Sequence, residues 1–432
     1  MKKNRKAEQF HTIVIGGGAS GMAAALASSE TGNPILLLEK QDCLGRKLLA
    51  TGNGRCNLTN LDQRPEYYRS DHPDTARKIL SSFGAEETIR LFGRVGIQTR
   101  QKDGYVYPYS EMAAPVRYLF ERAVEMRKNI RVITEEEVRQ IQPVGRYVEA
   151  DGQICGRYLV KTSRKQYLGD HVIISTGGLA GPEFGCSGDG YRLAEELGHS
   201  LITPLPALTA LRSPAPFLKK LKGVRIKAAI CLIVDQEPVY RDQGELQWTA
   251  GGISGIVVFQ ASRFASVALH EGKTVELVID FMPEYPHEEV CRLLTAIEEE
   301  EKDFQLLKYR MAGIFPRKIV PVLIREAGLS EDRPVHTLSE DQINRLAHVI
   351  KAFPLRINGV TGYEKAQVTR GGIPLSELDE NLQSKKWPGI YFTGEVVDVD
   401  GICGGYNLQW AWASGTTAGK AASYDDVRRY IY

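Results

Sequence analysis

Residues 11–21 read His-Thr-Ile-Val-Ile-Gly-Gly-Gly-Ala-Ser-Gly, an apolar run followed by glycines in the spacing G-x-G-x-x-G. The run predicts a buried strand over residues 12–15. The three spaced glycines stand where a tight turn, a close phosphate approach and a close helix–strand contact each require glycine. The alanine-rich stretch that follows predicts a helix whose free amides and positive dipole end favour a bound anion. The candidate binding residues in this turn are Gly16, Gly18, Ala19, Ser20 and Gly21.

A second apolar run over residues 35–38 follows the turn Asn33-Pro34 and ends in Glu39. A carboxylate at the end of the second strand accepts hydrogen bonds from ribose hydroxyls, and it suits a ribose without a 2′-phosphate, as in FAD or NAD. Glycine-rich turns are common, so the spacing alone is weak. Strand, helix, second strand and acid in sequence together predict an adenine-dinucleotide site. FAD and NAD both remain open at this point.

Composition narrows the class of protein. The 432 residues exceed one ordinary core, so two or three domains are expected. A net charge of +2 without a basic stripe argues against a nucleic-acid partner or an anionic membrane. No apolar run approaches the ~20 residues of a membrane span, and the basic residues at the start are not followed by the apolar run of a signal peptide. We therefore expect a cytoplasmic protein with a small-molecule substrate, and its oligomeric state stays open.

Cysteines and histidines give no sign of a disulfide framework or a metal. The seven cysteines are scattered and form no C-x-x-C pair, which is typical of reduced thiols. None of the eight histidines stands at metal-ligand spacing from another, so no metal site is predicted.

Further along the chain, the pattern predicts a helix over 112–128 and a third strand over 130–133, which completes a β-α-β-α-β unit. Strand-like runs separated by turn signals then predict a small antiparallel excursion, over 147–150, 158–162 and 172–175. The last run leads into Thr176-Gly-Gly178, where a doubly wound sheet would next contact its ligand.

A group of prolines from about residue 204 onward indicates that a second domain begins there. Strand-like runs follow at 226–234, 256–259 and 275–279. Two helices are indicated by apolar stripes, Val290, Leu293, Leu294 and Ile297 in the first and Ile343, Leu346, Ala347 and Ile350 in the second. Ser339 and Gln342 predict a capping box at the start of the second helix.

The chain then returns to its first pattern, with a strand over 389–394, acids at Glu395 and Asp398, and a glycine-rich turn before a helix near Asn407. A block inserted into a dinucleotide fold explains this return. We expect a dinucleotide-binding domain in two parts, 1–200 and 369–432, interrupted by a β-rich subdomain over 201–284, a helical subdomain over 285–352 and a return strand over 353–368.

In combination these motifs resemble a known family, the bacterial NAD(P)/FAD-dependent oxidoreductases that include aminoacetone oxidase and a 3-dehydro-bile-acid reductase. The resemblance runs nearly end to end. The motifs that carry it are Gly16-Gly-Gly-Ala-Ser-Gly21, Leu38-Glu-Lys40, Gly45-Arg-Lys47, Gly52-Asn-Gly-Arg-Cys-Asn57, Thr176-Gly-Gly178, Val368-Thr-Arg-Gly-Gly372, Tyr391-Phe-Thr-Gly-Glu395 and Gly404-Gly-Tyr-Asn-Leu-Gln409. It implies an α/β fold: a glutathione-reductase-like FAD-binding Rossmann domain with an inserted β-barrel plus helical subdomain.

Positions carried over from the family imply a noncovalent FAD. The first glycine turn would hold the pyrophosphate, Glu39 the adenosine ribose, and Val138 the adenine through its backbone. Glu395 would accept a hydrogen bond from a ribityl hydroxyl. The cofactor residues implied by position are Gly16, Gly18, Ala19, Ser20, Gly21, Glu39, Lys40, Arg46, Lys47, Thr51, Gly52, Asn53, Gly54, Arg55, Cys56, Asn57, Val138, Thr176, Gly177, Gly178, Gly371, Gly394, Glu395, Asp398, Gly405, Tyr406, Asn407, Leu408 and Gln409.

The C-terminal helix bears most on the chemistry that the resemblance implies. Amides around Asn407, Leu408 and Gln409 would face the N1 and O2 edge of the flavin, where reduced flavin carries negative charge. Arg370 is a candidate catalytic residue that would orient an anionic or carbonyl group, and an exposed arginine on a strand that runs into a tight turn is the alternative. Tyr406 is a second catalytic candidate, although buried tyrosines usually only pack and hydrogen-bond.

A redox pair made by Cys56 and Cys403 is a further possibility, which we disfavour because the close C-x-x-C spacing of disulfide reductases is absent. The implied activity is hydride transfer through flavin N5, with NAD(P)H reducing a small organic acceptor. No second G-x-G-x-x-G follows a strand, so NAD(P)H would dock transiently. An oxidase of a small amine such as aminoacetone, and an FAD-containing RNA-modifying or binding protein, are the alternatives.

Overall fold

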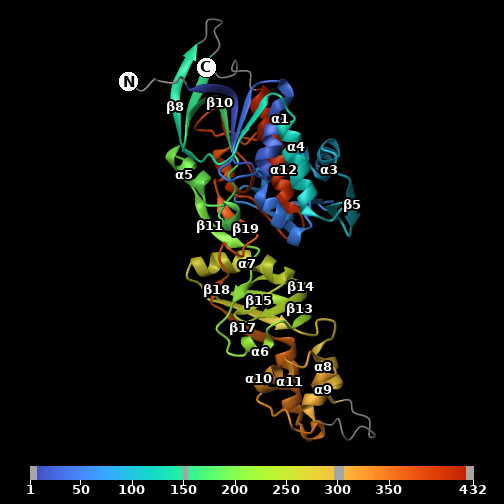
Figure 1. The fold of residues 1–432 in the computed structure, drawn as a ribbon. Helices are drawn as coiled ribbons and strands as arrows, with labels where there is room; N and C mark the ends of the chain where they lie inside the picture. Colours follow the sequence, from blue (N-terminus) through green and yellow to red (C-terminus); the bar gives the residue numbers. More distant parts are fainter. Residues whose placement is uncertain (1–6, 149–153, 296–305, 425–432) are drawn as a thin grey trace. The chain divides into compact units, whose positions relative to one another are not determined.

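The computed structural model describes residues 7–148, 154–295 and 306–424. Contacts divide the chain into two compact units, one made of residues 1–205 and 367–432 and the other of residues 206–366. Figure 1 shows the elements of both units along the chain. No helix within the described ranges is long and apolar enough to cross a membrane.

The first unit is built on a seven-stranded sheet whose strands run in the order β7-β2-β1-β10-β9-β8, with β20 paired to β10. Their bounds are β1 Glu8–Ile15, β2 Ile35–Leu38, β7 Ile130–Ile133, β8 Val138–Val148, β9 Ile154–Thr162, β10 Gln166–Ile174 and β20 Ile390–Phe392. The pairs of β1 with β2 and β10, of β2 with β7 and of β10 with β20 are parallel. The carboxyl ends of these five strands therefore meet at one edge, where such sheets bind ligands.

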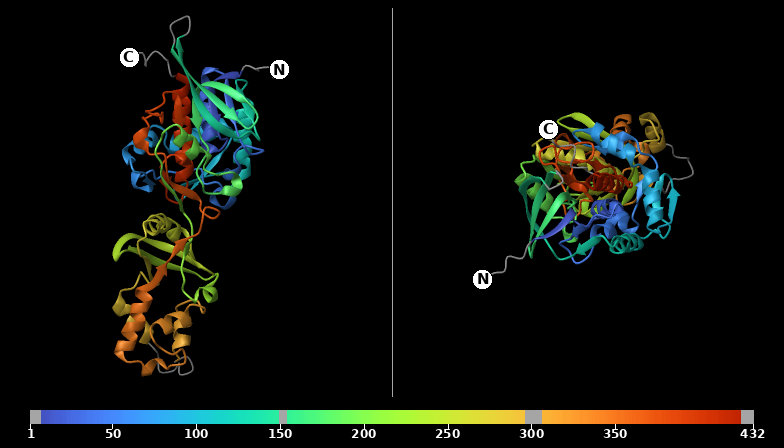
Figure 2. Two further views of the ribbon diagram at one scale, coloured as in Figure 1. Left: turned by 90° about the vertical axis from the view of Figure 1, so that its left-hand side faces the viewer. Right: turned by 90° about the horizontal axis from the view of Figure 1, so that it is seen from above.

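Helices α1 (Ala19–Ser28), α4 (Ala113–Glu125) and α12 (Tyr406–Tyr424) lie side by side against this sheet (Figures 1 and 2). Small residues let α1 and α12 approach closely. A Cβ atom added at Gly415 would stand 2.2 Å from the Ser20 carbonyl oxygen, and one added at Gly419 would stand 2.4 Å from that of Ala24. This close packing holds helix α12 against helix α1, which begins at the first glycine turn.

The first unit also contains smaller elements. The strands are β3 Thr59–Asn60, β4 Tyr68–Arg69, β5 Thr99–Lys102, β6 Tyr105–Pro108, β11 Ile202–Ala207, β19 Val368–Gly372 and β21 Asp400–Gly401. The α-helices are α2 Pro73–Ser82, α3 Ala85–Arg94 and α5 Asp189–Glu196. The 3-10 segments are η1 Ser29–Thr31, η2 Arg46–Gly54, η3 Pro65–Tyr67, η4 Pro182–Phe184, η7 Leu375–Glu377 and η8 Gly394–Val396.

The second unit contains another seven-stranded sheet, with the order β17-β16-β13-β14-β15-β12-β18 and antiparallel pairing. The strands are β12 Leu211–Arg212, β13 Arg225–Val234, β14 Glu237–Thr249, β15 Gly252–Ser254, β16 Val275–Asp280, β17 Phe353–Ile357 and β18 Gly359–Val360. The helical segments are α6 Leu218–Leu221, α7 Ile256–His270, α8 His287–Thr295, α9 Leu307–Ala312, α10 Val320–Glu326, η6 Val335–Thr337 and α11 Glu340–Lys351. Helix α7 packs along the sheet, and the sheet and helices share one hydrophobic core.

The α/β Rossmann-type fold of the first unit is confirmed. The third strand forms over the expected residues, and the capping box forms, since the Gln342 amide donates to Ser339 Oγ at 3.3 Å. The expected barrel and its division into β-rich and helical subdomains stay predictions. Ala150, at the end of one predicted strand, and Ile297, in one predicted stripe, lie outside the described residues.

The strand predicted over residues 256–259 is wrong, because this segment begins helix α7. Its β-branched and aromatic residues favour a strand locally. The continuation of the chain decides otherwise: Val257, Val258, Ala261 and Ala265 are buried at helical spacing against the sheet. Packing of this helical face outweighs local β propensity.

Candidate functional site

The first glycine turn has the geometry that its spacing predicts. A Cβ atom at Gly21 would stand 1.9 Å from the Gly16 carbonyl oxygen, so helix α1 approaches the turn more closely than any side chain permits. At Gly18, by contrast, an added Cβ atom would meet nothing within 4 Å. Gly18 is also the N-cap of α1 and makes no side-chain cap. The turn therefore leaves an open space at a helix N-terminus, as a pyrophosphate requires.

Glu39 is held rigidly at the carboxyl end of β2. Its Oε2 atom accepts the Gly17 amide at 2.7 Å, and its Oε1 atom accepts the Gln41 amide at 2.8 Å. Each carboxylate oxygen keeps a further lone pair, so the group can still accept hydrogen bonds from a ribose. The segment that leads to Val138 lies beside it, because the Glu136 amide donates to the Glu39 carbonyl oxygen at 3.0 Å. The predicted ribose and adenine contacts thus stand at one corner of the sheet edge.

The basic residues of the next motifs already have protein partners. Arg46 donates to Gln41 Oε1 at 2.5 Å, and Lys40 pairs with Asp189 at 2.5 Å. Lys47 Nζ lies 2.6 Å from Glu395 Oε2. Burial by itself would lower the Lys47 pKa, but the Glu395 carboxylate raises it above its ordinary value. The Lys47–Glu395 pair connects the early motif to the strand end that carries the predicted ribityl contact.

The loop over residues 51–57 adopts an unusual backbone. Asn53 and Cys56 have φ angles of 53° and 57°, in the left-handed region that non-glycine residues rarely occupy. Such conformations persist where surrounding structure enforces them, often at ligand sites. The Cys56 side chain is buried, and burial raises the pKa of its thiol to about 11. A thiolate is therefore disfavoured there, which agrees with a packing role rather than a redox role.

Three motifs far apart in the sequence meet near Glu395. Its Oε1 atom accepts the Thr369 amide at 2.9 Å. The Thr369 hydroxyl accepts the amides of Leu179 and Ala180 at 2.8 and 2.9 Å. A Cβ atom at Gly178 would stand 2.5 Å from Thr369 Oγ1 and 2.8 Å from Glu395 Oε1. The Thr176-Gly-Gly178 turn, strand β19 and the end of β20 thus form one wall.

Asp398 and Arg370 lie next to this wall. Asp398 is 1 % exposed; its Oδ2 atom accepts the Asp71 amide at 3.0 Å. Burial raises the Asp398 pKa, and the Arg370 guanidinium acts against this shift. Arg370 is half-buried, and its Nη1 atom donates to the Thr203 carbonyl oxygen at 3.5 Å. Arg370 is therefore partly buried and held by a backbone carbonyl rather than standing alone at the surface.

At the start of α12, Tyr406 packs against two tyrosines from a much earlier part of the chain. Tyr406 is 4 % exposed, and its ring lies 5.2 Å from that of Tyr67 and 5.5 Å from that of Tyr68. Burial raises the Tyr406 pKa well above its ordinary value, so the phenol stays protonated. Asn407 closes the turn, because its Oδ1 atom accepts the Gly401 amide at 2.8 Å.

Gln409 differs from its predicted role in one respect. Its amide donates to the Gly405 carbonyl oxygen at 2.9 Å, as part of the helix itself. Its buried side chain accepts the hydroxyls of Thr59 and Thr88 at 2.6 and 2.8 Å. The amides of Asn407 and Leu408 lie in the first turn of the helix, where amides have no carbonyl partner within the helix. These two therefore remain candidates for facing the flavin.

Unpartnered polar atoms test whether these residues fit an FAD. Buried polar atoms normally have hydrogen-bond partners. Asn57 Oδ1, Thr176 Oγ1 and Asp398 Oδ1 are buried, and the described residues give them none. All three belong to motifs predicted to contact the cofactor, and Gly18 in the first glycine turn has open space before it. The residues therefore fit a bound dinucleotide. The described ranges bring no three His, Cys, Asp or Glu side chains together in a group that could hold a metal ion.

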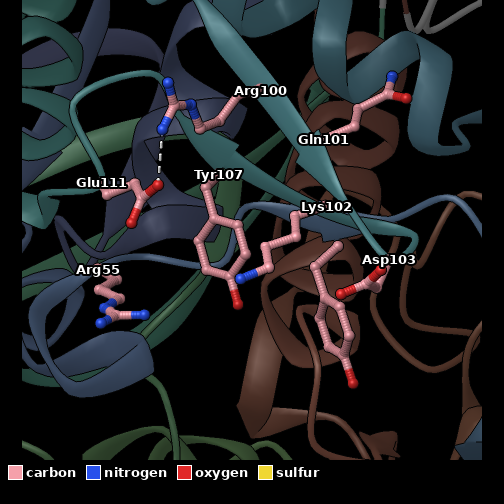
Figure 3. A pocket seen from close by; sticks show the side chains of 8 residues that line it. Arg55, Arg100, Gln101, Lys102, Asp103, Tyr107 and Glu111 are labelled. Carbon is pink, nitrogen blue, oxygen red and sulfur yellow. Dashed lines mark hydrogen bonds and ion pairs between the residues drawn. The ribbon is translucent and has the colours of Figure 1, made fainter.

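A cavity of about 380 Å³ adjoins the loop over residues 51–57 (Figure 3). Apart from Arg55, its lining was not foreseen from the sequence. The hairpin of β5 and β6 supplies most of it, and the lining residues are Arg55, Arg100, Gln101, Lys102, Asp103, Tyr105, Tyr107 and Glu111. The signal that could have found it is the turn Asp103-Gly104 followed by tyrosines at alternate positions, which predicts a hairpin with one aromatic face.

The comparisons with known proteins agree with this geometry. The sequence profile of the HI0933-like protein Rossmann domain matches residues 10–421. A 3-dehydro-bile acid delta(4,6)-reductase of Clostridium scindens is 37 % identical, over 95 % of this chain and 98 % of the relative. A ribosomal RNA dihydrouridine synthase of Escherichia coli is 30 % identical, over 94 % of this chain and 96 % of the relative.

Among solved structures, an open conformation of a flavocytochrome c3 fumarate reductase aligns with a TM-score of 0.45 and 13 % identity, covering 96 % of this chain and 78 % of that chain. A 3-ketosteroid-delta4-(5alpha)-dehydrogenase from Rhodococcus jostii aligns with a TM-score of 0.43 and 13 % identity, covering 98 % of each chain. The family is shown by the profile match and by the bile acid reductase. The chain thus belongs to the HI0933-like Rossmann family and is a flavin-dependent oxidoreductase.

Proposed function

We propose that this protein binds FAD noncovalently and uses NAD(P)H to reduce a conjugated carbon–carbon double bond in a small organic acceptor. The observation that carries the proposal is the match with the 3-dehydro-bile acid delta(4,6)-reductase over 95 % of this chain. The name of that relative describes removal of ring double bonds beside a keto group. FAD, when bound, supplies an atom that takes up and gives back hydride.

The residues of this chain have separate tasks in the proposal. The open turn at Gly18 and the N-terminus of α1 bind the pyrophosphate, while Glu39 binds the ribose. The first-turn amides of α12 lie where a helix dipole stabilises negative charge. Arg370 orients the carbonyl oxygen of the acceptor, and its hydrogen bond to the Thr203 carbonyl oxygen positions its guanidinium. Tyr406 stays a candidate proton donor, because its phenol is protonated at neutral pH.

Anaerobic mixing tests the donor. We expect NADH or NADPH to bleach the flavin absorbance of the yellow protein, and aminoacetone to leave it unchanged. A conjugated keto-steroid should then restore the absorbance without oxygen. Bleaching by aminoacetone alone would instead favour the amine-oxidase alternative. For the cofactor itself, heat or acid should release FAD, and an apoprotein that binds NAD but never FAD would contradict the proposal.

An RNA-modifying function is the second candidate, because two relatives are ribosomal RNA dihydrouridine synthases. They are 29 % and 30 % identical and cover 93 % and 94 % of this chain. The word dihydrouridine in their names also describes saturation of a conjugated double bond, so the same flavin chemistry would account for that reaction. The reduced protein should be mixed with ribosomal RNA and with a keto-steroid in parallel. Reoxidation by RNA and not by the keto-steroid would mean that the acceptor is RNA rather than a small organic molecule.

We also propose that the protein acts in the cytoplasm.

A further inference from the structure

The cavity beside the loop over residues 51–57 carries positive charge that the protein does not neutralise. Arg100 pairs with Glu111 at 2.8 Å. The side chains of Arg55 and Lys102 are exposed and make no hydrogen bond or ion pair with the described part of the chain. Asp103, at the hairpin turn, is the other acid in the lining. The pKa of Glu111 is lowered first by its hydrogen bond from Arg100 and further by Arg55 and Lys102. The cavity thus favours an anion.

The same cavity has an aromatic wall. Tyr105 and Tyr107 stand at alternate positions of β6, so they point to one face, while Val106 and Pro108 are buried on the other. The two rings are nearly parallel, at 27°, with centroids 6.4 Å apart. In Figure 3 the ring of Tyr107 lies between Arg55 on one side and Lys102 on the other. An aromatic face flanked by cations suits a planar base joined to phosphate.

The cavity also borders the predicted flavin motifs. A Cβ atom at Gly404 would stand 3.0 Å from Tyr105 Cε1 and 3.2 Å from Tyr406 Cε2. Asn60 Nδ2 donates to the Gly404 carbonyl oxygen at 3.3 Å. Tyr105 therefore touches the turn that leads into α12, and Arg55 stands between Gly54 and Cys56 of the other motif. A ligand held here would lie beside the predicted flavin site.

We propose that Arg55, Lys102, Tyr105 and Tyr107 form a nucleotide-binding subsite, in which the cations bind phosphate and the tyrosine rings contact the base. A cavity of about 380 Å³ lies within the size range of small-ligand sites. The inference rests on the proposed function, which requires NAD(P)H to dock although the chain has no second G-x-G-x-x-G turn. A nucleotide of an RNA would offer the same chemistry, so the experiment separates the two sources.

The experiment measures binding to the flavin-loaded protein, independently of turnover. NADP⁺, which cannot reduce the flavin, a short oligouridylate and inorganic phosphate are titrated by calorimetry at low and high salt. The double variant Arg55→Gln/Lys102→Gln should weaken nucleotide binding about tenfold or more and reduce its salt dependence. Tyr107→Leu should weaken nucleotide binding about fivefold and leave phosphate binding unchanged. Binding of NADP⁺ alone identifies the reductant, and binding of oligouridylate alone identifies RNA.

Matched controls separate this subsite from general charge and from the cofactor. Arg122→Gln/Lys165→Gln removes the same charge from exposed positions of the same unit, and it should change affinity less than about twofold. Because Arg55 also stands in a predicted FAD motif, Lys102→Gln is measured alone, and flavin content is checked for every variant. Unchanged nucleotide affinity in the double variant, or no nucleotide binding to the wild-type protein, overturns the subsite.

The outcomes distinguish this inference from the proposed function. If NADPH fails to bleach the flavin while nucleotide binding still depends on Lys102, the donor assignment fails and the subsite stands. If NADPH bleaches the flavin of the double variant at the wild-type apparent affinity, the subsite fails and the oxidoreductase proposal stands.

Discussion

The edge of the first sheet and the core of the second unit differ in how many of their buried polar atoms have hydrogen-bond partners. At the sheet edge, Gly18 faces open space and Asn57, Thr176 and Asp398 each bury a polar atom without a partner among the described residues. In the second unit, strands and helices share one apolar core. Among the described residues of this unit, Trp248 Nε1 is the one buried side-chain polar atom without a hydrogen-bond partner. The difference indicates that the sheet edge presents polar groups suited to a ligand, whereas the core of the second unit is built from apolar side chains.

The largest expected effect is loss of cofactor. In Gly21→Val, the first side-chain atom would stand 1.9 Å from the Gly16 carbonyl oxygen, so the turn must open. We expect purified protein with less than about a tenth of the wild-type flavin content, since the helix end and phosphate site no longer meet. Absorbance at the flavin band against total protein measures this.

Gly18→Ala sharpens the same comparison. Its Cβ atom meets no protein atom within 4 Å, so thermal stability of the apoprotein should stay near that of the wild type while FAD affinity falls. Gly93→Ala, also without a neighbour within 4 Å, is the matched control and should keep both properties. Equal FAD affinity in Gly18→Ala would contradict the phosphate site.

A change in the other region should give the opposite result. Leu277 is fully buried in β16, and Leu277→Ala should lower the free energy of unfolding by about 2–5 kcal/mol through lost burial and a residual cavity. Flavin content per folded molecule should not change. Denaturant unfolding followed by fluorescence, with flavin content measured in parallel, tests both statements. Loss of flavin from fully folded Leu277→Ala protein would contradict the prediction that the core of the second unit does not affect cofactor binding.

A smaller, pH-dependent effect is expected at a cluster that holds the residues after β19. His199 Nδ1 lies 2.6 Å from Glu377 Oε2, and its Nε2 atom lies 2.8 Å from Ser384 Oγ. Burial by itself would raise the Glu377 pKa, but hydrogen bonds from Ser200, Lys386 and His199 outweigh it and lower the pKa to about 2. Burial lowers the pKa of His199.

Both groups take up protons more readily in the unfolded chain, so stability falls as the pH falls. The His199 contribution is lost below its unfolded pKa of about 6.5, and the Glu377 contribution is lost between about 4.5 and about 2. Glu377→Gln should remove on the order of 1–3 kcal/mol at neutral pH and flatten the acid side of the stability profile. The exposed Glu380→Gln is the control, and an unchanged acid profile in Glu377→Gln would count against the cluster.

The smallest effect is expected at Cys56. Because its thiol is buried and has a pKa of about 11, Cys56→Ser should keep FAD and turnover and reduce stability by only about 1 kcal/mol. Turnover in the presence of reductant, with flavin content as the control, is the measurement. Lost turnover with retained FAD would restore the redox-cysteine alternative.

Local patterns predicted much of the first region because its chemistry depends on short motifs. The glycine turn, the strand that ends in Glu39 and the return to the sheet near residue 390 each follow from a few neighbouring residues. The prediction failed at residues 256–259, where β-branched residues lie in helix α7 because the sheet covers one helical face. It also assigned the Gln409 amide to the flavin, whereas the helix uses it.

The sequence by itself determined that the chain has a dinucleotide turn and a second group of motifs near its C-terminus, because steric and capping requirements act over a few residues. Only the tertiary structure decided which motifs meet. It pairs Lys47 with Glu395, places Gly178 against Thr369, and sets Arg55 beside the tyrosines of a hairpin that local pattern linked to no site. Such contacts depend on the packing of strands and helices far apart in the chain, which no local pattern specifies.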